Sequence, residues 1–409
     1  MVDTPQTAAE GAAVAPRSLM STVVLALGTF AVGTDIFVIA GFLPSMADSL
    51  QSSVAEVGQS VTAFAISFAV LAPILAAATA SMPRRMLLIG ALVILCVANI
   101  ASAAAVNLAM LLASRIFASV GAAIYTPVAT AVSAAMVQPD QRTRAMAIVG
   151  AGLAISTALG VPLGALFSQW MGWRAALALV AAMFLLPIVG ISLLLPRVPP
   201  SPAIGLRARL AVLRRSDALM VLPLTVLGMA ATYLPYAYIA PAMTSAGIPS
   251  IALPAILFLY GAGAVCGNLT TGIATDRWGP IVVLRTVYVA MALALGLVWV
   301  MSTIDAPSMV VAAGASFGWG MTTWMQTPPQ QYRLITAMPA QGALVIALNS
   351  SSIYVGIGLG TTLGGLVIAT SPRNVFGFAA AAAIVALMYL LASDAKMKNK
   401  KRTGGAGRH

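Results

Sequence analysis

The sequence predicts an all-α membrane protein in which twelve transmembrane helices form two six-helix bundles, with both termini in the cytoplasm. Three observations carry this prediction: the composition, the long apolar segments and the positions of the basic residues. The chain has 409 residues, of which 60% are hydrophobic and only 8% are charged. Because a soluble protein carries roughly 25% charged residues, the composition indicates an integral membrane protein.

Long apolar segments predict where the chain crosses the bilayer. Crossing the ~30 Å hydrocarbon core takes about 20 residues of helix, and most of the segments reach that length. Lipid offers the backbone no hydrogen-bond partner, so apolar runs without strand alternation indicate helices rather than a barrel. The twelve expected helices are 18–44, 57–80, 86–106, 108–134, 144–169, 174–195, 218–243, 250–274, 281–302, 308–328, 341–369 and 375–393.

The basic residues predict the orientation of these helices. With the N-terminus in the cytoplasm, 19 of the 22 Lys and Arg residues fall in cytoplasmic segments, whereas Arg174 and Arg373 fall outside and Arg115 lies within a helix. The positive-inside rule then places both termini in the cytoplasm. Because the net charge of +12 is spread over short loops rather than one soluble surface, we expect the lipid bilayer as a partner and no nucleic acid.

The longest internal connection divides the predicted helices six and six, as is typical of transporters built from repeats. It begins with a proline-rich stretch, which resists helix formation, and continues with several arginines, which favour the anionic inner leaflet. The expected parts are a cytoplasmic tail at 1–17, an N-terminal bundle at 18–195, a cytoplasmic linker at 196–217, a C-terminal bundle at 218–393 and an unordered basic cytoplasmic tail at 394–409.

One carboxylate, Asp35, lies deep within an apolar segment. A charge at that depth costs at least ~2.5–3.5 kcal/mol, so such residues usually pair with another charge or face a water-filled cavity. Asp35 precedes Pro44 by nine residues, which is ~13 Å of helix. Arg115 follows Asn107 by eight residues, or ~12 Å. We therefore expect the two charges at matching depth, toward the outer half of the bilayer.

Two interpretations of this pair stay open. In the first it is a proton site, because burial favours the protonated carboxyl group while a nearby Arg favours the ionised form. A carboxylate balanced between these effects can take up a proton on one side of the membrane and release it on the other. In the second interpretation the pair is a permanent structural ion pair that braces the N-terminal half.

Four stretches of the chain together carry a family resemblance. They are Gly33-Thr34-Asp35-Ile36-Phe37 with Leu43-Pro44, Arg115 to Ala123, Gly152 to Gly164 with Gly172-Trp173-Arg174, and Gly272 to Gly279. With these stretches the chain resembles the major facilitator superfamily, in its twelve-helix drug–proton antiporter branch, and in particular bacterial drug, sugar or arabinose efflux proteins. The resemblance covers about residues 18–393.

The resemblance implies that Asp35, with Arg115, couples transport to protons. It also implies an antiporter motif in the fifth helix, which accompanies export in this family. That motif comprises Gly152, Gly160, Pro162 and Gly164. Tight packing is the other interpretation, because small residues let helices approach closely in lipid. The glycines of the eleventh helix have a spacing that predicts such a close crossing; they are Gly356, Gly360, Gly364 and Gly365.

A short loop motif is implied to gate the cytoplasmic side. Its second-half copy contains Asp276 and Arg277, and Asp276 would cap a neighbouring helix or pair with a base when that side is closed. The first-half copy contains Arg84 and Arg85 but lacks the Asp that the family carries before them. An ordinary solvated loop is the alternative interpretation of both copies.

Polar and aromatic residues within the predicted helices mark the expected wall of a substrate cavity, because small-molecule sites are mostly apolar with a few placed polar groups. Some of the aromatic residues could instead anchor the chain at the membrane interface. We expect no charge within the C-terminal helices. The candidates are Phe37, Tyr125, Tyr233, Tyr236, Tyr238, Tyr260, Asn268, Trp319, Trp324, Gln326, Asn349 and Tyr354.

The sequence contains no phosphate-binding loop, no nucleophile–base set and no metal-ligand spacing, so we expect no enzyme, no metal and no cofactor. It predicts a monomeric transporter of the bacterial inner membrane. This transporter would export a small drug-like or neutral organic molecule in exchange for protons, with the proton gradient as its energy source. The alternatives are a dedicated exporter of sugars or other metabolites, facilitated or proton-coupled uptake with a structural Asp35, and a sensor or channel.

Overall fold

The computed structural model describes residues 15–138, 141–196 and 215–405, together with Val198, Gly205 and Ala211. Most of the predicted linker, the first fourteen residues and the last four lie outside this part of the chain. The described residues form helices and loops without a strand, which confirms the all-α class. Within them, eleven segments are long and apolar enough to cross a membrane.

The N-terminal half contains six candidate membrane-crossing segments, three of which are interrupted. Its elements are α1 (Ala15–Phe37), η1 (Val38–Gly41), α2 (Leu43–Ser49), α3 (Val54–Ala78), α4 (Arg84–Ala103), α5 (Leu108–Ala135), α6 (Arg142–Ile155), η3 (Ser156–Gly160), α7 (Val161–Met171), α8 (Trp173–Met183) and α9 (Leu185–Leu194).

The C-terminal half repeats this pattern. Its elements are α11 (Ser216–Tyr236), α12 (Ile239–Ser245), η5 (Ser250–Ala252), α13 (Leu253–Trp278), α14 (Pro280–Thr303), α15 (Met309–Met325), α16 (Thr327–Ala337), η6 (Pro339–Gln341), α17 (Gly342–Thr370), η7 (Pro372–Asn374) and α18 (Val375–Gly405).

The twelfth crossing is made by α15 and α16 together. The α15 helix has 17 residues, and a turn at Gln326 separates it from α16. Pro329 has no backbone N–H to donate to the carbonyl of Met325, so a continuous helix would leave that carbonyl unpaired. The hydroxyl of Thr271 on α13 donates to it instead, at 2.9 Å.

Proline also explains why the first helix of each half is interrupted. Helix α1 ends at Phe37 and the chain passes through η1 to α2, where Pro44 stands at the start of the helix. Helix α11 ends at Tyr236 before α12, which contains Pro241. A proline removes the hydrogen bond to the carbonyl four residues earlier. The predicted helices 18–44 and 218–243 are therefore each two helices, broken at equivalent places.

The last helix extends further than predicted. Helix α18 continues through Gly405, so the expectation of an unordered tail from 394 onward is wrong for residues 394–405. Lys and Arg are good helix formers, and a helix that begins in the bundle is already nucleated when it reaches them.

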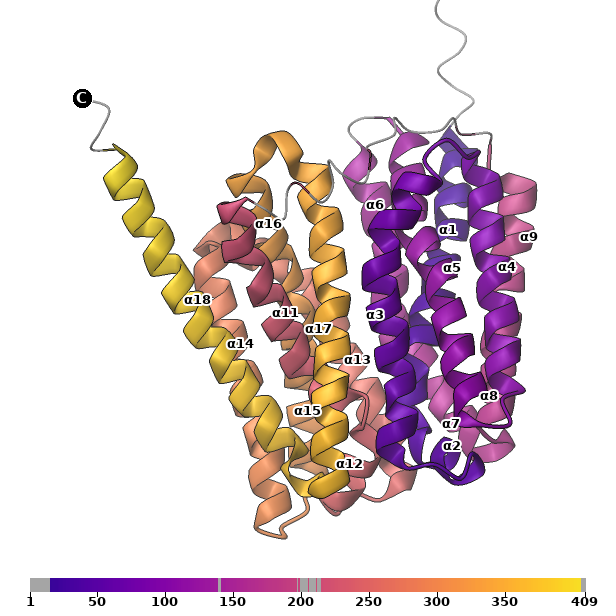
Figure 1. Ribbon diagram of the computed structural model, residues 1–409, viewed down its shortest axis with the longest axis vertical. Helices are drawn as coiled ribbons and strands as arrows, with labels where there is room; N and C mark the ends of the chain where they lie inside the picture. Colours follow the sequence, from indigo (N-terminus) through magenta and orange to yellow (C-terminus); the bar gives the residue numbers. More distant parts are fainter. Residues whose placement is uncertain are drawn as a thin grey trace, which may run out of the picture.

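The two halves stand side by side, and the start of α1, the end of α9 and the start of α11 lie at the same end of the molecule (Figure 1). We call this the linker end, and the opposite end, which holds α2, α7 and α12, the distal end. The halves contact each other through α3 and α17, and at the distal end through α7 with α13 and α2 with α12. The amide of Gln169 on α7 donates to the carbonyl of Ser250 across the distal interface, at 3.3 Å.

The predicted glycine-mediated crossing of the eleventh helix is confirmed, and its partner is α11. A Cβ atom added to Gly356 would lie 2.6 Å from the carbonyl oxygen of Val226. A Cβ added to Gly360 would lie 2.5 Å from that of Ala230. The backbones therefore approach too closely for any side chain, which is the packing that small residues permit in lipid.

We expect Gly356→Ala to lower the thermal unfolding temperature of the detergent-purified protein, because the new methyl group must push α17 away from α11. Gly296→Ala on α14 is the matched control, since a Cβ there meets nothing within 4 Å and Ala favours a helix over Gly by about 1 kcal/mol. Equal melting temperatures for the two variants would contradict the close crossing.

Candidate functional site

The core of the candidate site is a fully buried ion pair between α1 and α5. The Nη1 of Arg115 donates to Oδ1 of Asp35 at 2.6 Å, and its Nη2 donates to the backbone carbonyl of Asp35 at 3.2 Å. The exposed fractions of the two side chains are 1% and 0%. The structure therefore brings together the two charges that the sequence places at matching depth.

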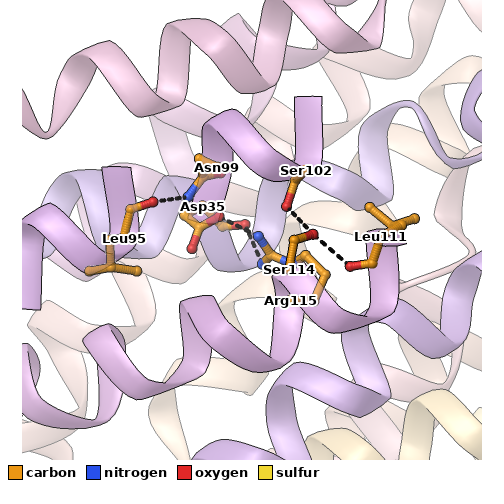
Figure 2. Close-up of polar contacts among 7 residues, drawn as sticks. All are labelled: Asp35, Leu95, Asn99, Ser102, Leu111, Ser114 and Arg115. Carbon is orange, nitrogen blue, oxygen red and sulfur yellow. Dashed lines mark hydrogen bonds and ion pairs between the residues drawn. The ribbon is translucent and has the colours of Figure 1, made fainter. Parts of the chain in front are cut away.

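Neighbouring helices fix the position of Arg115. Asn107 caps α5 by accepting a hydrogen bond from the backbone of Met110 at 2.8 Å, which sets where the helix begins. One residue before Arg115, the hydroxyl of Ser114 lies 2.8 Å from that of Ser102 on α4 (Figure 2). The guanidinium carbon of Arg115 also lies 5.0 Å from the ring centre of Phe64 on α3, a cation–π contact.

Three buried polar atoms of this region have no hydrogen-bond partner: Oδ2 of Asp35, Nε of Arg115 and Oδ1 of Asn99. Asn99 uses its amide nitrogen to donate to the carbonyl of Leu95 at 2.9 Å, and Figure 2 shows it on the helix that also presents Ser102 to the site. Buried polar atoms without partners are uncommon and call for an explanation. The free carboxylate oxygen is the atom on which a proton would reside.

The fifth helix packs against α1 through the glycines of the predicted antiporter motif. A Cβ added to Gly152 would clash with Thr29 and Ala26, one added to Gly160 with Thr34, and one added to Gly164 with Val38. These contacts lie along α1, which carries Asp35, and the η1 turn that follows it, so the motif sets how closely the fifth helix approaches α1.

A π-helical segment interrupts the fifth helix at Ser156–Gly160, just before Pro162. Such π-turns are frequent at functional sites. Backbone atoms of Thr157 and Ala158 meet Gly261 of α13 so closely that a Cβ on that glycine would clash. The irregular turn is therefore also where the fifth helix touches the other half of the molecule.

A cavity of about 2170 Å³ lies between the halves. Its lining runs from Met20, Arg84 and Leu195 at the linker end to Phe37 and Tyr233 near the middle of the bundle. The contacts at the distal end close it on that side. Among the lining residues that the structure describes there is no Asp or Glu, and Arg84 is the lining residue with a charge.

The structure divides the predicted wall residues into two groups. Those that line the cavity are Phe37, Tyr233, Asn268, Trp324 and Tyr354. Those that do not line it in this conformation are Tyr125, Tyr236, Tyr238, Tyr260, Trp319, Gln326 and Asn349.

Several residues of the second group are held away from the cavity by hydrogen bonds. The hydroxyl of Tyr125 donates to the carbonyl of Leu25, and that of Tyr238 to the carbonyl of Thr361, both at 3.1 Å. The Oδ1 of Asn349 accepts from Thr225 at 2.8 Å, and the amide of Gln326 donates to the carbonyl of Thr323 at 3.1 Å. The sequence identified these residues as polar and buried but gave no information on which way they face.

The predicted gating residues lie at the linker end, where the cavity opens. Arg84 donates to the carbonyl of Ala80 at 2.9 Å, and Arg85 donates to the carbonyl of Ser192 on α9. Asp276 and Arg277 are exposed at the end of α13. Within the described part of the chain, Asp276 has no ion-pair or hydrogen-bond partner.

Sequence reasoning missed a buried charge in the C-terminal half. Arg333 lies on α16 with an exposed fraction of 6%, so this half contains a buried charge just beyond the predicted tenth helix. It donates to Gln330 at 2.7 Å, and Gln330 in turn donates to Thr225 at 3.1 Å. The sequence did contain an indication of this site. Gln326, Gln330 and Arg333 repeat with helical spacing, which continues the helix past its predicted end at residue 328.

Comparison with known sequences assigns most of the chain to one family. A family model described as the Major Facilitator Superfamily matches residues 25–343. The chloramphenicol resistance protein of Streptomyces lividans is 30% identical over 334 residues, which cover 80% of this chain and 78% of that protein. The inner membrane transport protein YdhP of Escherichia coli (strain K12) is 28% identical over 347 residues, which cover 84% of this chain and 87% of that protein.

Solved structures share the fold of this chain. The nucleoside transporter NupG superimposes with a TM-score of 0.75 at 14% identity, over 92% of this chain and 99% of that chain. A D-xylose-proton symporter superimposes with a TM-score of 0.76 at 16% identity, over 91% of this chain and 97% of that chain. At this level of identity the likeness concerns the arrangement of helices alone.

We expect Arg115→Leu to destabilise the protein by about 3–5 kcal/mol, because it leaves the buried carboxylate of Asp35 without its partner. The double variant Asp35→Leu/Arg115→Leu should recover much of this loss, since it removes both charges. Thermal unfolding in detergent measures both effects. A double variant that is no more stable than Arg115→Leu would contradict a stabilising role confined to the pair.

Proposed function

The chain belongs to the Major Facilitator Superfamily, and we propose that it exports small neutral organic molecules from the bacterial cytoplasm in exchange for protons. It is a multi-pass membrane transporter rather than an enzyme. The observation that carries the proposal is the fully buried pair of Asp35 and Arg115, which lies two residues from the cavity-lining Phe37 on α1.

The linker end is the cytoplasmic end in this proposal. The positive-inside rule supports this orientation, because the basic residues gather in the segments that meet there. The cavity then opens to the cytoplasm and is closed toward the outside. This is the state in which an exporter collects its substrate, and rocking of the two halves would next open the distal end.

The proton site in this proposal is the free Oδ2 of Asp35. In the state described here Oδ1 of the carboxylate is bonded to Arg115. Opening of the distal end would bring water to the pair, and a proton on Oδ2 would neutralise the carboxylate and weaken its bond to Arg115. Return to the cytoplasm-facing state releases the proton inside, so that one proton enters for each substrate molecule exported.

The direction and the substrate class rest on separate observations. The glycine motif of the fifth helix supports export, as does the name of the chloramphenicol resistance protein to which the chain is similar. The absence of a carboxylate among the described lining residues disfavours cationic substrates, which need a counter-charge in a site of low dielectric. Aromatic lining residues favour flat, neutral molecules.

The exposed end of α13 at Asp276 supports the same conformational cycle. Its carboxylate has no partner in the described structure, in which the cavity opens at the linker end. We infer that Asp276 forms an ion pair with a basic residue of a neighbouring helix when that side closes. This pair would stabilise the outward-facing state.

We expect Asp35→Asn to abolish exchange in liposomes, because an amide cannot carry a proton through the cycle. The measurement is the pH change that a trapped dye reports when chloramphenicol, and then a panel of neutral aromatic compounds, is added to liposomes with an imposed pH gradient. Asp48→Asn is the matched control, since Asp48 is exposed at the distal end and should leave exchange intact.

Two outcomes would overturn the proposal. If Asp35→Asn liposomes still exchange protons for substrate, the ion pair is structural and the proton site lies elsewhere. An antiporter accumulates substrate on the side with more protons. If the wild type does not do so with the pH gradient in either direction, it is not an antiporter.

A further inference from the structure

A cluster of aromatic side chains lies immediately beyond the closed end of the cavity. It consists of Phe37 from α1 and four residues from three helices of the other half, Tyr233, Tyr236, Tyr260 and Trp319. Phe37 stacks on Tyr233 with ring centres 5.8 Å apart, and Tyr236 lies 4.9 Å from Tyr260 and 6.0 Å from Trp319. We call these five residues the aromatic cluster.

Three hydrogen-bond donors of the aromatic cluster have no partner. They are the hydroxyls of Tyr236 and Tyr260 and the Nε1–H of Trp319, whose side chains are 3%, 1% and 1% exposed. Trp324, on the cavity wall, likewise has a buried Nε1–H without a partner. Trp N–H can only donate, and a buried donor without an acceptor destabilises the fold.

Other buried tyrosines of this protein do not share this property. Tyr125 and Tyr238 donate to backbone carbonyls at 3.1 Å, and Tyr288 donates to Oε1 of Gln326 at 3.3 Å. Leaving tyrosine hydroxyls unpaired is therefore not a general feature of these helices. Among the Tyr and Trp side chains of the described residues, the buried donors without a partner lie at the cavity and directly behind its closed end.

Phe37 and Tyr233 separate these donors from the cavity. Both residues line the large cavity, and both also line a small void of about 10 Å³ that is bounded by Tyr236. The void has room for about one water molecule, so a larger group can enter only if the ring of Tyr233 turns aside. Tyr233 lies near the end of α11, just before the interruption that precedes α12.

We propose that the aromatic cluster is a substrate subsite that takes a neutral aromatic molecule carrying a hydrogen-bond acceptor, such as a ketone, quinone or nitro group. The flat ring would stack against Phe37 and Tyr233, and the acceptor would reach the hydroxyl of Tyr236 and the Nε1–H of Trp319. The inference rests on the proposed function in that the cavity must be the transport cavity. It adds the requirement for an acceptor, which the uncharged lining alone does not give.

A pair of matched probes tests this requirement. 2-Acetylnaphthalene and 2-ethylnaphthalene have nearly the same shape, but only the first carries a carbonyl acceptor. Their binding to the purified protein is measured by calorimetric titration at one fixed detergent concentration, so that partition into micelles cancels when variants are compared with the wild type for the same probe.

We expect Tyr236→Phe to weaken binding of 2-acetylnaphthalene about 3- to 10-fold, the effect of one lost neutral hydrogen bond, and to leave 2-ethylnaphthalene unchanged. Trp319→Phe should show the same selectivity. Tyr288→Phe is the control, because the hydroxyl of Tyr288 already has a partner outside the cluster. It should leave the ratio of the affinities for the two probes unchanged.

Unfolding temperatures provide a second readout. Tyr236→Phe should unfold at the wild-type temperature or above it, because it removes an unpaired buried hydroxyl, whereas Tyr288→Phe should unfold at a lower temperature. A loss of affinity that is equal for both probes, or a Tyr236→Phe variant that loses stability as Tyr288→Phe does, would overturn the subsite.

Failure of this inference is distinguishable from failure of the proposed function. Binding is measured without a proton gradient, so an inactive exchange assay with selective probe binding would remove the antiport mechanism and leave the subsite. If exchange is normal and depends on Asp35, but the cluster variants change the binding of both probes equally, the subsite is ruled out and the proposed function is not.

Discussion

The structure depends first on the neutralisation of one buried carboxylate. Asp35 has no contact with solvent and is bonded to Arg115 at 2.6 Å, and removing either partner would leave the other as a costly unpaired buried charge. This pair joins α1 to α5, and the hydroxyl pair of Ser102 and Ser114 and the ring of Phe64 hold the helix that supplies the arginine. The second carboxylate oxygen of Asp35 has no hydrogen-bond partner, so Arg115 engages one of the two oxygens.

Close backbone approach is the second constraint, and it places the cavity. The fifth helix lies against α1 and α13 through Gly160 and Gly261, and α17 lies against α11 through Gly356. The contact of Gly261 with Thr157 and Ala158 joins the two halves, whereas the contacts of Gly160 and Gly356 hold helices together within the N-terminal and the C-terminal half. The cavity lies between the halves toward the linker end.

The aromatic cluster connects these two features. Phe37 follows Asp35 by two residues, and its ring stacks on Tyr233 of the other half. A substrate that displaces these rings would therefore act on the segment that carries the ion pair. This continuity gives a physical route by which occupancy of the cavity and the position of the ion pair can influence each other.

The sequence by itself determined the helical class, the crossings, the depth of Asp35 and Arg115 and the glycine crossing of the eleventh helix, because hydropathy, helical rise and residue size act locally. The prolines that interrupt α1 and α11 were equally visible. The tertiary structure alone decided which polar side chains face the cavity. Asn268 and Asn349 are both amides in apolar helices, yet one lines the cavity and the other bonds to Thr225. It also revealed that Arg333 is buried, since its burial depends on α11 and α14 packing around α16. The physical reason is that the sequence shows which residues share each face of a helix, whereas the packing of neighbouring helices determines which face meets water, lipid or protein.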